Sequence, residues 1–153
     1  MASVALVVSH CDDDALFFGG LVLSQPEHSW TIIACSVPRI DSIRAWKFFD
    51  AVEALGAKGR LMPWQEPEPS EPFDEQQLAL LDLEGYDHIV THGVEGGYGH
   101  VQHKSLSAFI HKRWAHKVIW SDAPPGKSDY DVEVQLLPWQ RERKLAAIRR
   151  YDH

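Results

Sequence analysis

The chain has 153 residues, which at about 150 residues per domain predicts a single domain over residues 1–153. Its 15 basic and 22 acidic residues leave a net charge of −7 at pH 7, which argues against nucleic acid as a partner. Two cysteines are too few for a disulfide framework, and no apolar run approaches the roughly 20 residues of a membrane span. These features predict a small cytoplasmic domain with no membrane span.

Strand and helix patterns alternate along the chain. Apolar, β-branched runs predict strands at 4–8, 30–36, 60–62, 87–92 and 117–120, and an alternating run predicts an edge strand at 130–136. Helices are expected at 15–23, 41–55, 74–83, 101–114 and 138–150, the first capped by Asp13 or Asp14. The proline-rich segment 64–73 and the glycine-rich segment 93–99 are expected to be loops.

This alternation predicts the fold class α/β: a Rossmann-like three-layer αβα sandwich with a mostly parallel sheet. In such sheets, ligands bind beyond the carboxyl ends of the strands, where the strand order reverses. If strands 4–8 and 87–92 are neighbours, the loops that follow them face each other across one crevice.

Histidine and aspartate residues cluster in these two loops. The first reads HCDDD from His10, and the second ends with His100 and His103, which are three residues apart and so project from one side of a helix. Imidazole and carboxylate together suit Zn²⁺, and three protein ligands with an open fourth position are typical of a catalytic site. The alternative is a solvated loop with a helix cap and two unrelated histidines.

Both loops resemble motifs of a known enzyme family. HCDDD followed by GG, with GGYGHVQH after a later strand, resembles the PIG-L/LmbE-like zinc-dependent de-N-acetylases, among them N-acetylglucosaminylphosphatidylinositol deacetylase. That family usually has HPDDE as its first motif, and its second ends in GHxxH. Weaker matches are Arg44 ahead of Leu55-Gly56, with Lys47 where the family has glutamate, and the stretch from Lys144 to Tyr151.

The resemblance implies a role for each matching residue. Asp12 takes the position of the general base, and His100, when protonated, that of the histidine that supports the oxyanion. The implied metal is Zn²⁺, with Fe²⁺ as the alternative. Its implied ligands are His10, Asp13 and His103. The candidates for contacting substrate are Asp14, Arg44 and Tyr98.

The chain also departs from the family pattern. Cys11 replaces the usual proline and is either a small buried hydrophobe or a soft metal ligand, and Asp14 replaces the usual glutamate. The domain is short at its C-terminal end relative to the family.

The expected function is hydrolysis of the N-acetyl group of an amino sugar or related small glycoconjugate by a metal-dependent amidohydrolase. The alternatives are hydrolysis of another small-molecule amide and a non-catalytic binding domain. The sequence leaves open whether the protein forms a homo-oligomer.

Overall fold

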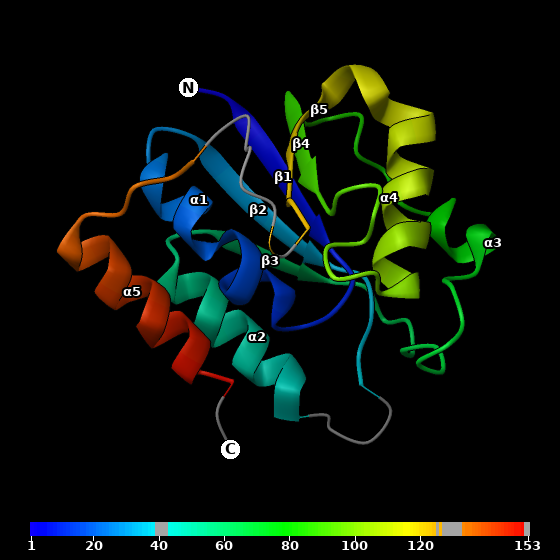
Figure 1. Cartoon of the computed structure of the whole chain (residues 1–153), viewed down its shortest axis with the longest axis horizontal. Coiled ribbons are helices and arrows are strands. Elements are labelled where there is room, and N and C mark those ends of the chain that lie inside the picture. The colour runs from blue at the N-terminus through cyan, green and yellow to red at the C-terminus, as the bar shows by residue number, and fades with distance from the viewer. Residues whose placement is uncertain (39–42, 125, 127–132, 152–153) are drawn as a thin grey trace.

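In a computed structural model, which describes residues 1–38, 43–124, 126 and 133–151, five strands form one sheet (Figure 1). The strands are β1 (Ser3–Val8), β2 (Ser29–Ala34), β3 (Lys58–Leu61), β4 (His88–Thr91) and β5 (Val118–Ser121). They lie in the order β3-β2-β1-β4-β5, and every neighbouring pair is parallel.

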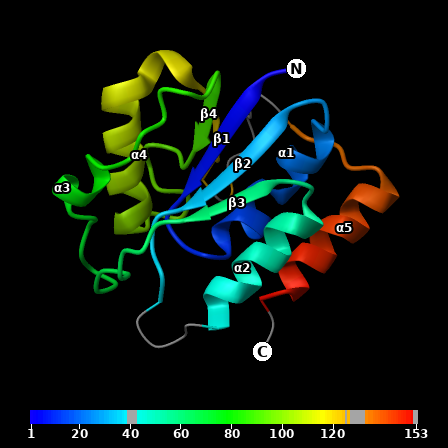
Figure 2. The same ribbon diagram turned by 180° about the vertical axis from the view of Figure 1, so that it is seen from behind.

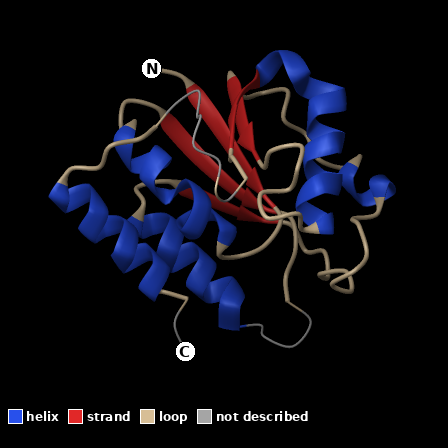
Figure 3. Cartoon of the chain, viewed as in Figure 1, coloured by secondary structure: helices blue, strands red, loops and turns tan. Residues whose placement is uncertain are grey.

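Helices cover both faces of the sheet (Figures 2 and 3). One face carries the π-helix η1 (Asp14–Phe18) with its continuation α1 (Gly19–Ser24), then α2 (Ile43–Ala54) and α5 (Pro138–Arg149). The other carries α3 (Glu75–Leu78) and α4 (Val101–Trp114), which ends in a 3₁₀ turn at Ala115–Lys117. The predicted αβα sandwich is confirmed. No helix among the described residues has the length and apolar character needed to cross a bilayer.

The central strand β1 is buried on both sides, as its continuous apolar run predicts. Val4, Leu6 and Val8 pack into the core beneath η1, α1, α2 and α5, whereas Ala5 and Val7 pack into the core beneath α3 and α4. All five side chains are completely buried. The alternation of side chains along β1 therefore contributes to the cores on both faces of the sheet.

The strand order reverses between β1 and β4, because β2 follows on one side of β1 and β4 lies on the other. Val4 pairs with His88 and Val7 with Thr91, so the two strands end at the same edge of the sheet. The predicted adjacency of these strands is confirmed. Their following loops, which hold the histidine and aspartate clusters, therefore meet at the switch point.

Three predicted elements differ in the structure. Residues 133–136 of the expected edge strand form no strand, and 130–132 lie outside the described residues. Leu136 packs instead against α1, where a Cβ on Gly20 would come within 3.3 Å of its Cδ1 atom. The helix expected at 74–83 is a single turn capped by Asp74, after which 79–81 continue in tighter turns. Asp13 caps nothing, because its side chain turns back toward His10.

Candidate metal centre and active site

The loop after β1 is a tight turn that directs the Asp13 carboxylate inward. The His10 N–H donates to Asp13 Oδ2 at 2.9 Å, and the Asp12 N–H donates to the His10 carbonyl at 3.0 Å. The Asp13 side chain is almost completely buried, whereas that of Asp12 remains about one-third exposed. The two adjacent aspartates thus face different surroundings, one in the interior and one at the surface of the site.

The glycine-rich loop after β4 delivers the second cluster. Gly96, Gly97 and Gly99 have φ values of 70°, 63° and 94°, which L side chains rarely adopt. The loop ends at His100, the N-cap of α4, and His103 follows in the first turn of that helix. The glycines are needed because the chain must fold back sharply between the end of β4 and the start of α4.

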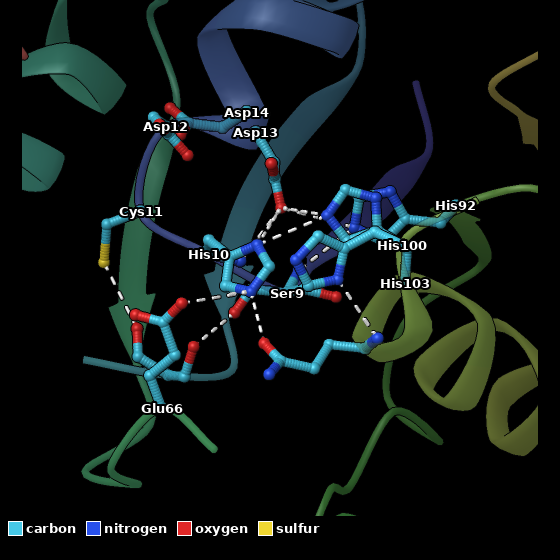
Figure 4. A network of polar contacts seen from close by, with 12 residues as sticks. Ser9, His10, Cys11, Asp12, Asp13, Asp14, Glu66, His92, His100 and His103 are labelled. Atoms are coloured by element: carbon cyan, nitrogen blue, oxygen red, sulfur yellow. Dashed lines mark hydrogen bonds and ion pairs between the residues drawn. The ribbon is translucent and has the colours of Figure 1, made fainter. Parts of the chain in front are cut away.

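Three side-chain atoms converge where the two loops meet (Figure 4). Asp13 Oδ2 lies 3.2 Å from His10 Nδ1 and 3.2 Å from His103 Nε2, and the two nitrogens are 3.3 Å apart. Bonds of 2.0–2.2 Å to a tetrahedral zinc ion require ligand atoms about 3.3–3.6 Å apart. The donor set and its spacing therefore fit a metal ion of this kind.

Two other triads of ligand-type side chains share His103: His10 with His100, and Asp13 with His92. The His92 ring stacks on His103 at 3.8 Å, but its Nε2 accepts the Ser9 N–H at 3.1 Å. Its Nδ1 faces Asp122 Oδ2 at 3.6 Å. Because the Nε2 lone pair is already engaged, His92 is better placed to support the site than to bind a metal ion.

The polar groups of this cluster shift one another's protonation. Burial alone would raise the pKa of Asp13, but its contacts with the rings of His10, His103 and His92 hold it well below its usual range. Burial alone would lower the pKa of His10, but its hydrogen bond and charge interaction with Asp13 outweigh this and raise it to about 9. The buried carboxylate is ionised and surrounded by imidazoles, the composition expected of a cation site.

A cavity of about 240 Å³ opens beside the three converging atoms. Asp12 faces it, with Arg44 Nη1 3.6 Å from its Oδ2 atom. Burial and the nearby charge of Asp13 raise the pKa of Asp12, which makes it a stronger base than an exposed aspartate. Also lining the cavity are Leu16, Phe17, Glu66, Tyr98 and His100.

His100 reaches this cavity as the N-cap of α4. Its Nδ1 accepts the Gln102 N–H at 3.2 Å, so the neutral ring carries its proton on Nε2. Burial, and then the charges of His10 and His103, lower the pKa of His100. This differs from the expected imidazolium and favours a neutral ring that donates a hydrogen bond through Nε2.

Asp14 and Cys11 lie behind the cavity. Asp14 has no exposed surface, and its Oδ1 accepts the Tyr151 hydroxyl at 2.8 Å, a position that does not fit the expected contact with substrate. The Cys11 thiol is fully buried and donates to the Ser36 carbonyl at 3.4 Å, as a small core residue does. Of the expected substrate contacts, Arg44 and Tyr98 lie at the cavity.

The Asp14–Tyr151 contact predicts a pH-dependent loss of stability in Tyr151→Phe. Burial raises the pKa of Asp14 to about 7, from about 4 in the unfolded chain. The folded protein therefore favours the protonated side chain, and this contribution to stability is complete below about pH 4 and is lost as the pH rises through 7. The hydroxyl reduces that loss by stabilising the carboxylate. We expect Tyr151→Phe to lower the free energy of unfolding by about 1–3 kcal/mol, with the larger value at pH 8 than at pH 5.

Urea unfolding of the metal-free protein at both pH values measures this difference. The control is Tyr98→Phe, which removes a hydroxyl from a side chain that is 56% exposed and should change stability by less than about 0.5 kcal/mol. If Tyr151→Phe lowers the free energy of unfolding equally at both pH values, the contact does not depend on the charge of Asp14.

A larger cavity, of about 760 Å³, adjoins the first across Leu16 and Phe17. Among the described residues, none of the three groups of converging metal-ligand side chains lies on it, so we place the chemistry in the smaller cavity. Trp64, at the start of the proline-rich segment, is buried in the core beneath α3 and α4.

Sequence reasoning did not single out three residues of the site. Glu66 places a carboxylate oxygen 3.5 Å from His10 Nε2, Gln102 contacts the same nitrogen, and Phe17 lines the cavity. Gln102 carried a signal, because it lies inside the HVQH motif between two candidate histidines. Glu66 carried none, since nothing in the proline-rich segment indicates that it folds back onto the loop after β1.

No family model and no curated protein matches the chain. Solved structures do share its fold. An N,N'-diacetylchitobiose deacetylase from Pyrococcus horikoshii superposes with a TM-score of 0.71 at 14% identity, over 98% of this chain and 69% of the other. The zinc-inhibited form of teicoplanin deacetylase Orf2 gives a TM-score of 0.67 at 13% identity, over 97% and 83%.

The same fold also carries another activity. GalB from Pseudomonas putida KT2440, a 4-carboxy-2-hydroxymuconate hydratase, superposes with a TM-score of 0.63 at 16% identity, over 99% of this chain and 79% of the other. The structural neighbours thus include deacetylases of the PIG-L/LmbE type, and the chain has their fold.

Proposed function

We propose that this protein is a metal-dependent hydrolase that removes the N-acetyl group from an amino sugar or a related small glycoconjugate. The observation that carries the proposal is the near-equilateral arrangement of His10 Nδ1, Asp13 Oδ2 and His103 Nε2, with edges of 3.2–3.3 Å. Asp12, a carboxylate of raised pKa, stands beside it on an open cavity. Fold neighbours that deacetylate sugar-containing compounds support the reaction class.

His10, Asp13 and His103 would hold the metal ion, with zinc as the proposed occupant and Fe²⁺ as the alternative. When bound, such an ion lowers the pKa of water and polarises a carbonyl oxygen. The three residues suit the task because they come from the loop after β1 and the first turn of α4, and these segments follow adjacent strands. Their backbone positions are therefore set by the core of the sheet rather than by mobile segments.

Asp12 supplies proton transfer. Its carboxylate lies on the cavity, so it can take a proton from an attacking water molecule and later return it to the departing amine nitrogen. The Arg44 guanidinium, 3.6 Å away, orients this carboxylate. His100 would donate its Nε2 proton in a hydrogen bond to the amide oxygen of the substrate as negative charge develops there.

The cavity walls suit a polar ring compound. Tyr98 and Phe17 have ring centroids 6.2 Å apart and remain 56% and 39% exposed at the cavity. Aromatic rings pack against the apolar faces of sugar rings, while Arg44 and Glu66 offer a donor and an acceptor for hydroxyl groups. Both kinds of contact lie within one small cavity, which favours a sugar unit over a long apolar amide.

The test measures acetate release from a panel of N-acetylated amino sugars and simple amides. The protein is stripped of metal, then supplied with one equivalent of Zn²⁺ or Fe²⁺. We expect release from at least one amino sugar, lost on stripping and restored by one of the metals. Release from simple amides alone would contradict the sugar assignment. No release with either metal would overturn the deacetylase proposal, and the reaction of GalB makes hydration of a hydroxy-acid double bond the next activity to assay.

A further inference from the structure

We infer that Gln102 is a positioning residue that sets the tautomer of His10, so that Nδ1 is the nitrogen presented to the metal ion. This assignment rests on the proposed metal site. Gln102 lies in the first turn of α4, between His100 and His103, and its side chain is completely buried. A buried amide must satisfy its donors and its acceptor within the protein, so its contacts define its orientation.

The orientation of the Gln102 amide follows from its surroundings. Its Nε2 lies 3.2 Å from the Pro67 carbonyl oxygen and 3.0 Å from the Glu68 carbonyl oxygen. Backbone carbonyls can only accept hydrogen bonds, so the group between them must be the NH₂ end of the amide. Both of its protons are then used, and the oxygen Oε1 is left facing His10.

The amide oxygen in turn decides the protonation of His10. Oε1 lies 2.5 Å from His10 Nε2, and because an amide oxygen can only accept, Nε2 must carry a proton. Glu66 Oε1, another acceptor, lies 3.5 Å from the same nitrogen. The lone pair of a neutral His10 ring therefore lies on Nδ1, the atom that approaches Asp13 Oδ2 and His103 Nε2.

Gln102 also ties the site to the proline-rich loop. The carbonyls that hold its NH₂ group belong to residues 67 and 68, and the Phe73 N–H donates to Ser105 Oγ one turn further along α4. One side chain thus links three segments: the loop after β1, the proline-rich loop and the start of α4. The amide oxygen contacts His10, whereas the NH₂ group holds the proline-rich loop. A substitution can therefore remove one of these contacts and keep the other.

The experiment compares zinc dissociation constants, measured by competition with a chromophoric chelator. Gln102→Met keeps the size of the side chain but removes its acceptor, and should weaken zinc binding by about 10–100-fold. The matched control is Gln140→Met. Gln140 is also buried and bonded through both amide ends, to Leu137 and Leu23, but it lies on α5. This control should lose stability yet bind zinc within about twofold of the parent.

Gln102→Glu tests the acceptor directly, because its carboxylate keeps an oxygen for His10 but has no protons for the two carbonyls. It should bind zinc at least about tenfold more tightly than Gln102→Met, while hydrogen exchange of residues 65–71 becomes faster. If both Gln102 variants bind zinc like the parent, or lose it equally, the assignment is overturned and the metal site stands. A parent protein that binds no zinc would overturn the proposed site itself.

Discussion

Asp12→Asn should lower the rate of deacetylation by about 10²–10⁴-fold and leave the metal content unchanged. Asparagine preserves the shape of the side chain but cannot take the proton of an attacking water molecule. The Asp12 carboxylate is outside the converging ligand atoms and has Arg44 as an ion-pair partner, so its loss leaves the other residues of the site in place. The measurement is kcat on the best sugar of the panel, together with zinc per chain by elemental analysis.

The control is Asp50→Asn on the exposed surface of α2, which should turn over at the parental rate. An Asp12→Asn variant with near-parental kcat would show that another group transfers the proton. Glu66 would then be the next candidate, because its carboxylate also lines the cavity and lies 3.5 Å from His10 Nε2. Asp14, which follows Asp12 so closely in sequence, is excluded from contact by its burial.

His103→Ala should reduce the zinc content from about one ion per chain to nearly none, and activity should be lost with it. Its Nε2 is the only nitrogen of α4 that lies within 3.3 Å of both His10 Nδ1 and Asp13 Oδ2 among the contacts the structure describes. Removing one of three protein ligands leaves two, too few for the geometry that catalytic zinc sites adopt. Elemental analysis of the dialysed protein gives the result directly.

Two further histidines of the same region serve as comparisons. His111→Ala, two turns along α4, removes a ring that is bonded to the Ser107 carbonyl at 2.8 Å and should retain zinc. His100→Ala should also retain zinc, although it lowers the rate. Zinc bound at parental stoichiometry in His103→Ala would contradict the ligand set, and zinc lost from His100→Ala would make His100 a ligand.

The fold could be predicted because its signals are local. Five apolar strand patterns alternate with helical ones, and each strand appears within a few residues of its expected place. The pattern failed at residues 133–136, which form no strand and of which Leu136 packs against α1. It also failed after Leu78, since the spacing of apolar residues continues there although the helix does not.

The candidate site was partly predictable for a different reason. His10, Asp12 and Asp13 lie in one short loop, and His100 and His103 lie in another, so two local motifs name five of its residues. Alternation of strands and helices then places both loops at strand ends. The motifs do not indicate which nitrogen of His10 faces Asp13 and His103, or whether a given aspartate reaches the cavity.

The sequence by itself determined the order of the elements, the residue types available for chemistry and the edge of the sheet, at the carboxyl ends of its strands, where those residues gather. Only the tertiary structure decided that Asp14 is buried against Tyr151, 137 residues away, that the Nε2 of His92 is engaged by Ser9, and that Gln102 orients His10. Periodicity and spacing record interactions among near neighbours in the chain. Contacts between distant residues depend on which strands and loops the packed core brings together, and no local pattern encodes them.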